Sequence, residues 1–292
     1  MGTDTRVVVG VDGSPESFEA LTWAACDASR RHRPLHVVHA FQLPTVYGPF
    51  PPPVPSPYDD ETRAAAERML AGSVARARTL APGLAVTSDM PMRQPATALL
   101  SAAEHADTVV VGSRGLGGFA GLLLGSVSIA VSAQAACPVV VTHHGGGRPD
   151  TAAGRILVGI DAAHDAERAL RFAFEQAAAR RTGLTAVYAH VLSRFAARSR
   201  IHAPGHEPDD LREDERRALA ESTCGWSERY PDVDVQRTVL DGSPGVVLTE
   251  LSAGAQLLVV GSRGHGGLAG MLLGSVSQAV VRHAECPVAV VH

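Results

Sequence analysis

The sequence predicts an α/β fold of two tandem Rossmann-like domains, each a doubly wound sheet of five parallel strands. Two observations carry this prediction. One segment occurs twice, and within each half of the chain apolar β-branched runs alternate with Ala-rich helical stretches. The length of 292 residues also suits two domains of about 100–150 residues each. We assign the domains to residues 1–146 and 147–292, because Gly and Pro mark a loop over residues 143–154.

The repeat continues without a gap over its longest stretch. Residues 110–141 and 259–290 are identical at 23 of 32 positions, at an offset of 149 residues. The same offset pairs Val38 with Val187 elsewhere in the chain. The halves are therefore equal in length with little net insertion, and the short linker is expected to keep them in contact.

The first half is expected to alternate strands and helices, and the second half to repeat the order. Ser14 is a favourable N-cap and Pro15 suits a first helical turn, so a helix is expected to begin there. Continuous apolar strands separated by helices indicate a parallel sheet covered on both faces, with right-handed crossovers. The expected elements are strand Arg6–Val11, helix Pro15–Arg31, strand Leu35–Phe41, helix Asp60–Leu80, strand Ala85–Met90, helix Ala96–His105, strand Thr108–Gly112, helix Ser126–Ala135 and strand Pro138–Thr142.

One segment departs from this alternation. Residues Leu43–Asp60 hold seven prolines, which fix φ and remove amide donors, so an extended surface loop is expected. A polyproline docking motif for a partner is the alternative. The matching segment of the second half, Ser193–Asp210, is polar and charged and has only two prolines.

Composition narrows the classes of function. The formal net charge is −4 and the pI about 6.3, which offers no basic footprint for nucleic acid. The apolar runs end well before the roughly 20 residues that span a bilayer, and no secretion signal is evident, so we expect a cytoplasmic protein without a membrane segment. Aromatic residues make up 4%, so the cores are expected to be aliphatic.

All 26 basic residues are Arg, and the chain has no Lys. That excludes both a phosphate-binding loop that depends on Lys and Schiff-base catalysis. Four cysteines do not make a disulfide framework. Cys137 and Cys286 each precede a Pro and an apolar strand, so we interpret them as core residues rather than redox sites. The 13 histidines have no recognisable ligand spacing, and no metal site is predicted.

The duplicated segment carries the motif with chemical content. Its glycines follow the spacing G-x2-G-x9-G-S, from Gly112 to Ser126 and again from Gly261 to Ser275. The first glycine ends a strand and the serine opens a helix, at the sheet edge where doubly wound folds bind ligands. Unhindered backbone amides and a helix N-terminus favour phosphate, and Arg114 and Arg263 add positive charge. The alternative is a tight, mobile loop without a ligand.

The end of the first strand offers a second feature. Asp12 and Asp161 can accept hydrogen bonds from ribose hydroxyls or adenine. The alternative is that each caps the following helix. Val38 and Val187, in the second strand, offer apolar contact and backbone groups to a base.

These residues make the chain resemble the ATP-binding subgroup of the universal stress protein family. The Val-Gly-Val-Asp start at residues 9–12, the glycine loop in both halves and the Cys-Pro-Val before the last strand carry the resemblance, which covers nearly the whole chain. It implies a doubly wound domain that binds ATP, with Mg²⁺ as a further candidate. It also implies dimerisation through the last strand, and we expect a homodimer or paired domains joined by strands Pro138–Thr142 and Pro287–His292.

The resemblance also implies which residues bind the nucleotide. In the first half they are Gly10, Val11, Asp12, Val38, Gly112, Ser113, Arg114, Gly115, Gly125, Ser126, Val127 and Ser128. In the second half they are Gly159, Ile160, Asp161, Val187, Gly261, Ser262, Arg263, Gly264, Gly274, Ser275, Val276 and Ser277.

The halves differ within this pattern. The family favours a glycine at Gly242, and Arg93 replaces it in the first half, which puts that turn in doubt and offers a second cation near the site. Leu116 in the first half is equivalent to His265 in the second half. No base recurs in both phosphate loops, so we predict an ATP-binding regulatory module in a stress response. The alternatives are a slow ATPase or nucleotidyl transferase, and a scaffold that needs no ligand.

Overall fold

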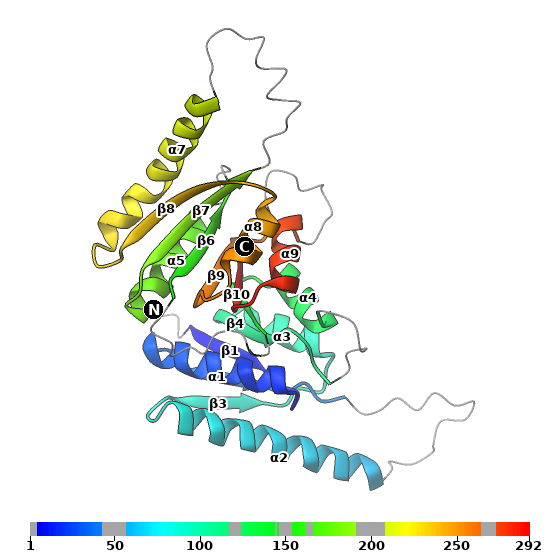
Figure 1. The fold of residues 1–292 in the computed structure, drawn as a ribbon. Helices are drawn as coiled ribbons and strands as arrows, with labels where there is room; N and C mark the ends of the chain where they lie inside the picture. The colour runs from blue at the N-terminus through cyan, green and yellow to red at the C-terminus, as the bar shows by residue number, and fades with distance from the viewer. Residues whose placement is uncertain are drawn as a thin grey trace, which may run out of the picture. The chain divides into compact units, whose positions relative to one another are not determined.

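Each half of the chain forms its own five-stranded parallel sheet with helices packed on it (Figure 1). The computed structural model describes residues 5–42, 57–116, 124–143, 145, 154–161, 166–190, 208–263 and 273–292, without the side chains of 57–59 and 208–212. The chain divides into two units, Met1–His144 and Gly145–His292.

The first sheet has the strand order β3-β2-β1-β4-β5, with every neighbouring pair parallel. The order reverses between β1 and β4, so the crossover helices diverge there and leave a crevice at the carboxyl ends of these strands. The elements of this half are β1 Arg6–Gly10, α1 Pro15–Arg30, β2 Leu35–Val38, α2 Pro57–Leu80, β3 Val86–Asp89, α3 Pro95–Ala103, β4 Ala106–Gly112, α4 Ser126–Gln134 and β5 Val139–Thr142.

The second sheet repeats this topology in the order β8-β7-β6-β9-β10. The doubly wound α/β fold expected from the sequence is therefore confirmed for both halves. The elements of this half are β6 Ile156–Ile160, α5 Ala166–Arg180, β7 Leu184–His190, α7 Pro208–Arg229, β8 Val235–Asp241, α8 Pro244–Leu251, β9 Leu257–Gly261, α9 Ser275–His283 and β10 Val288–Val291.

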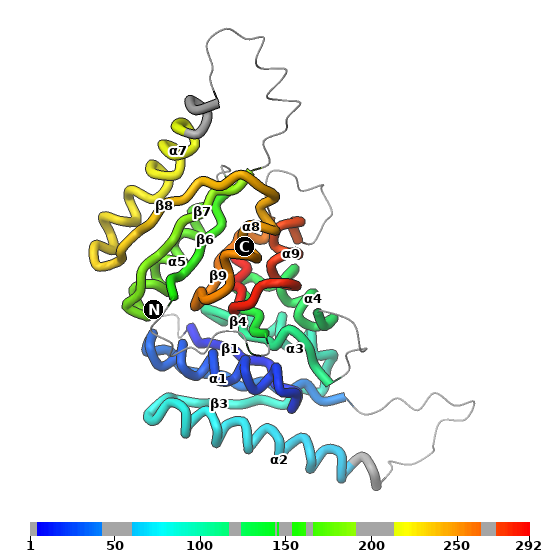
Figure 2. The backbone as a smooth tube through the Cα atoms, in the orientation of Figure 1, coloured from blue at the N-terminus to red at the C-terminus, as the bar shows by residue number. Residues whose placement is uncertain are grey.

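Local chemistry explains where the helices begin. Ser14 caps α1, and its hydroxyl accepts a hydrogen bond from the Ser17 amide at 3.1 Å. The expectation of an extended loop as far as Asp60 is wrong in its last residues, because Pro57 opens α2, which runs along β3 (Figure 2). Proline suits a first turn, where its missing amide has no helical partner to lose. Residues 43–56, with the other six prolines, lie outside the described residues.

The core of the first half is mainly aliphatic, although Trp23 and Phe41 are also buried in it. Val7, Val8 and Val9 of β1 are fully buried between the helices. The second half departs further from the expected aliphatic core, because Phe174 of α5 stacks on Trp226 and Tyr230 of α7. The first half has Ala at all three equivalent positions. Three aromatic side chains thus gather where α7 covers the second sheet.

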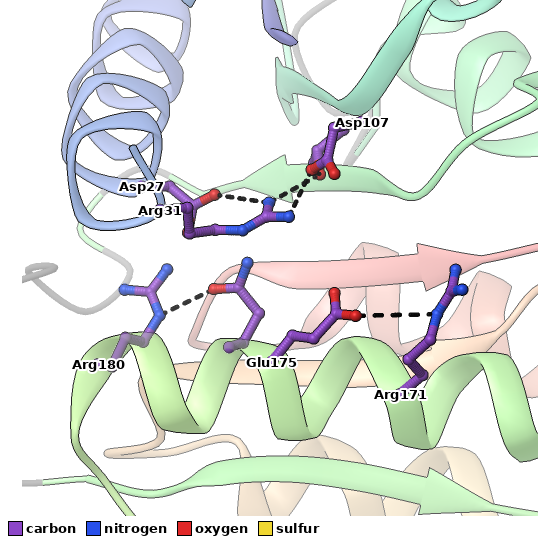
Figure 3. A network of polar contacts seen from close by, with 8 residues as sticks. Asp27, Arg31, Asp107, Arg171, Glu175 and Arg180 are labelled. Atoms are coloured by element: carbon purple, nitrogen blue, oxygen red, sulfur yellow. Dashed lines mark hydrogen bonds and ion pairs between the residues drawn. The ribbon is translucent and has the colours of Figure 1, made fainter. Parts of the chain in front are cut away.

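A buried ion-pair cluster joins α1 to β4 in the first half (Figure 3). The Arg31 guanidinium contacts the Asp107 carboxylate at 2.6 Å and the Asp27 carboxylate at 3.3 Å. Only 10% of the Arg31 side chain and 1% of the Asp27 side chain are exposed. Burial lowers the pKa of Arg31, but the two carboxylates more than offset this and raise it. The guanidinium is therefore held in its charged form.

His36, buried in β2, is expected to make the stability of the first half depend on pH. Burial, and then the nearby Arg6, lower its pKa below 6.5, and its Nδ1 lies 2.8 Å from the Thr87 hydroxyl. The unfolded chain therefore binds a proton more readily than the folded one. Stability should fall as the pH drops through and below 6.5, and this loss should be absent above it.

Urea titrations of the parent and of His36→Thr would measure this effect. Thr stands at the equivalent position of the second half, Thr185, so the variant introduces a residue that the fold already accepts there. Between about pH 7.5 and 5.5 the parent should lose more stability than the variant. Equal losses in the two proteins would exclude His36 as the source.

Candidate functional site

A cavity of about 500 Å³ opens at the carboxyl ends of β1 and β4 in the first half. This is the crevice that the reversal of strand order produces, and its volume lies within the roughly 300–1,000 Å³ of small-molecule sites. The residues that line it are Gly10, Val11, Asp12, Ser17, Val38, Ala40, Pro95, Leu99, Val111, Gly112, Arg114, Gly115, Leu124, Gly125, Ser126, Val127 and Ser128.

Three hydrogen bonds fix the two ends of the glycine loop. The Ser113 amide donates to the Thr142 carbonyl at 2.7 Å, and the Gly125 amide donates to the Ser113 carbonyl at 2.7 Å. The Ser128 hydroxyl donates to the Gly112 carbonyl at 2.6 Å. These bonds fix the points at which the chain leaves β4 and enters α4.

The N-terminus of α4 faces the cavity. Gly125 is its N-cap and carries no side chain that could bond the first-turn amides. Ser126, Val127 and Ser128 of that turn all line the cavity. Backbone amides at the positive end of a helix macrodipole favour an anion, so this end of the cavity is suited to phosphate.

Asp12 bridges the end of β1 and the glycine loop. Its Oδ1 accepts from the amide and hydroxyl of Ser14, at 2.9 and 2.6 Å, and its Oδ2 accepts from the Leu116 amide at 2.9 Å. Burial raises the pKa of Asp12, but these hydrogen bonds outweigh burial and the net pKa is lowered. Ser14, and not Asp12, is the helix cap, so the capping alternative for Asp12 is wrong.

Gly115 lies very close to the Asp12 carboxylate. A Cβ at this position would collide with Asp12 Oδ2, whereas the backbone φ of Gly115 lies outside the left-handed region. At Gly112 a Cβ would lie 2.7 Å from the backbone carbonyl carbon of Glu16 in α1. Both glycines thus let the loop lie against the β1–α1 corner.

Arg114 supplies the positive charge expected from the sequence, but it is paired. Its Nη2 lies 3.1 Å from Glu16 Oε1. The Arg114 side chain is 49% exposed and that of Glu16 13%. The cation that lines the phosphate end of the cavity is therefore paired with an anion.

The other end of the cavity is apolar. Val11, Val38, Ala40, Pro95 and Leu99 line it. A Cβ on Gly10 would lie 2.9 Å from Leu99 Cδ1, so this glycine is explained by packing against α3. A flat, apolar ring such as a nucleobase fits this chemistry.

The structure brings nearly all of the predicted first-half residues to one cavity. Ser113 is the exception, because its side chain is buried and its backbone serves to close the loop. Sequence reasoning did not select Ser17, Ala40, Pro95, Leu99, Val111 or Leu124. Their apolar or small side chains carry no chemical signal until the fold places them at the strand ends.

The second half closes its loop with the same bonds. The Ser262 amide donates to the Val291 carbonyl at 2.7 Å, the Gly274 amide to the Ser262 carbonyl at 2.8 Å, and the Ser277 hydroxyl to the Gly261 carbonyl at 2.6 Å. A Cβ on Gly159 would lie 2.7 Å from Leu248 Cδ1, as at Gly10. Gly264 and His265 lie outside the described residues, whereas the other predicted second-half residues are described.

The strand ends beside this second loop are more polar than those of the first half. His190, at the end of β7, lies 3.4 Å from Glu215 of α7 through Nδ1 and 3.7 Å from Asp241 of β8 through Nε2. Burial, then Glu215 and Asp161, raise the pKa of the neighbouring Tyr188. At the positions of His190, Glu215 and Asp241, the first half has Phe41, Ala66 and Met92.

Cys137 and Cys286 are buried, and burial raises the pKa of each thiol to about 12, which agrees with core residues. Arg93 is exposed and is not one of the described residues that line the cavity. Gly242, the residue of the second half that is equivalent to Arg93, has φ +147°, and its amide donates to the His190 carbonyl at 2.8 Å.

Comparison with known proteins agrees with this fold and loop. The model of the universal stress protein family matches residues 5–143 and again residues 153–292. The chain belongs to the universal stress protein family. Within it the protein is a tandem member, with one family domain in each half.

Relatives align along nearly the whole chain. A universal stress protein of Mycobacterium tuberculosis strain H37Rv is 40% identical over 288 residues, which are 97% of this chain and 96% of that protein. One of Mycolicibacterium smegmatis is 37% identical over 295 residues, covering 99% and 97%. The crystal structure of a universal stress protein from Archaeoglobus fulgidus has the same fold, with a TM-score of 0.70, 22% identity and coverage of 99% and 96%.

Among the described residues, no helix is both long and apolar enough to cross a bilayer.

Proposed function

We propose that this universal stress protein binds ATP in the first-half cavity and acts as a nucleotide-dependent regulatory module. The observation that carries the proposal is the pairing, in one cavity, of an apolar end with the uncapped N-terminus of α4. Adenine would lie against Val11, Val38 and Leu99. The phosphates would accept hydrogen bonds from the first-turn amides of α4.

Mg²⁺ would accompany the phosphates as part of the ligand. The Asp12 carboxylate lines the cavity, and the Glu16 carboxylate pairs with Arg114, which also lines it. Among the residues that the structure describes, no group of three or more His, Cys, Asp or Glu side chains is placed to hold a metal. A bound Mg²⁺ would therefore be held mainly by phosphate oxygens and water, as this ion commonly is.

A regulatory role fits the site better than catalysis. Both carboxylate oxygens of Asp12 already accept hydrogen bonds, and its lowered pKa makes it a weak base. A slow ATPase remains the alternative function, and it would need a base that the described part of the cavity does not supply. We propose that occupancy by ATP, rather than turnover, carries the signal in the cytoplasm.

The second half is proposed to hold a second ATP, because its glycine loop is closed by the same three bonds. We also propose that chains or halves pair through β5 and β10, as the family resemblance implies. Sedimentation of the parent and of a variant with Asp at both Val141 and Val290 would test that pairing.

Calorimetric titration of nucleotide-free protein tests the proposed function. We expect ATP to bind with a stoichiometry near two per chain, with hydrolysis far below the roughly 1–10³ per second of typical enzymes. The absence of heat for ATP, ADP and AMP alike would overturn the proposal. Turnover above about one per second that is lost on changing Asp12 would favour the enzyme alternative.

A further inference from the structure

Two carboxylates of the β1–α1 corner hold donor groups of the glycine loop. Asp12 accepts from the Leu116 amide, and Glu16 pairs with the Arg114 guanidinium. Arg114 lines the cavity together with the first turn of α4. An incoming phosphate would therefore meet a guanidinium that already has an anionic partner.

The Glu16 carboxylate is held in place more firmly than its partner. The Glu16 backbone packs so closely against Gly112 that a Cβ on Gly112 would lie 2.7 Å from the Glu16 carbonyl carbon. Its side chain is 13% exposed, and it belongs to the first turn of α1. The Arg114 side chain is 49% exposed, so the guanidinium is the partner with room to move.

We propose that Glu16 determines specificity by competing with the ligand's phosphates for Arg114; this inference rests on the proposed nucleotide site. A nucleoside has no phosphate that could bind Arg114, so its affinity should not depend on Glu16. A polyphosphate must either share the guanidinium or draw it away from Glu16. Glu16 therefore narrows the difference in affinity between ATP and adenosine.

The variant Glu16→Gln removes the competing charge and keeps the shape of the side chain. We expect it to bind ATP roughly two- to fivefold more tightly than the parent, the size that a partly exposed ion pair allows. The gain should be smaller for AMP and absent for adenosine. It should shrink in about 0.5 M salt, where interactions between exposed charges are screened.

Glu19→Gln is the matched control. It removes the same charge from the same helix, at an exposed position outside the Arg114–Glu16 pair. A second control places Glu16→Gln in an Arg114→Gln background, where the gain should vanish because the contested cation is gone. Thermal melts would verify that every variant is folded.

The calorimetric outcomes separate this inference from the proposed function. If the parent and Glu16→Gln both fail to bind ATP, the proposed function is wrong and the inference falls with it. If the parent binds ATP but Glu16→Gln binds it no more tightly than Glu19→Gln does, only the inference is overturned. Weaker ATP binding by Glu16→Gln that appears only with Mg²⁺ would assign Glu16 to the metal and also overturn it.

Discussion

Arg31→Leu is expected to destabilise the first half by about 3–5 kcal/mol, the cost of breaking a buried ion pair from one side. Arg31 is 10% exposed and contacts both Asp27 and Asp107, and its Nη1 lies 3.4 Å from the Thr108 hydroxyl. Removing the guanidinium leaves two carboxylates near each other without the charge between them. The ion pair that is lost joins α1 to β4, and both elements contribute residues to the cavity lining.

Urea unfolding, monitored by tryptophan fluorescence, would measure this loss of stability in the first half. The chain has two tryptophans, Trp23 in the first half and Trp226 in the second, so a Trp226→Phe background leaves Trp23 as the reporter. Arg63→Leu is the matched control, since the pair Arg63–Glu67 is more than half exposed and should cost less than about 1 kcal/mol. Similar losses for Arg31→Leu and Arg63→Leu would contradict the importance of burial.

Gly115→Ala is expected to weaken ATP binding in the first half by more than about tenfold, or 1.4 kcal/mol, without unfolding the domain. The added Cβ collides with Asp12 Oδ2, so the loop and the carboxylate must separate and the Leu116 bond is lost. Because the collision involves a side chain at the cavity mouth, the sheet beneath it is unaffected. In calorimetry the stoichiometry should fall from near two to near one.

Gly72→Ala provides the control for this substitution. Gly72 is exposed in α2, and nothing lies within 4 Å of the position that its Cβ would take. This variant should bind ATP as the parent does and be slightly more stable, because Ala favours a helix interior by about 1 kcal/mol over Gly. If Gly115→Ala kept full affinity and stoichiometry, the glycine loop would not form the phosphate site.

The order of the elements could be predicted because each half repeats a strong local pattern. The last strand was expected at Pro138–Thr142 and is observed at Val139–Thr142. The first turn of α2 was missed, because the six prolines before Pro57 indicate an extended chain and only the helix that follows shows that Pro57 belongs to it. The aromatic cluster around Phe174 was missed because a low overall aromatic content does not say where the aromatics gather.

Part of the candidate site could likewise be predicted from the sequence, and part could not. The glycine loop and Asp12 could be selected because their spacing and position have a direct chemical meaning. The ion pair between Arg114 and Glu16 could not, since an acidic residue in a first helical turn is already explained by the helix dipole. The cluster of His190, Glu215 and Asp241 needs three elements to come together, and no sequence spacing indicates that.

Amide hydrogen exchange with and without ATP tests the central claim most directly. The claim is that the first turn of α4 receives the nucleotide's phosphates, so saturating ATP should slow exchange at Ser126 and Val127. The equivalent turn of α9, at Ser275 and Val276, reports on the second half in the same experiment. Slowed exchange at Ser126 and Val127 is the predicted result; saturation with ATP that leaves both amides unchanged would contradict the account.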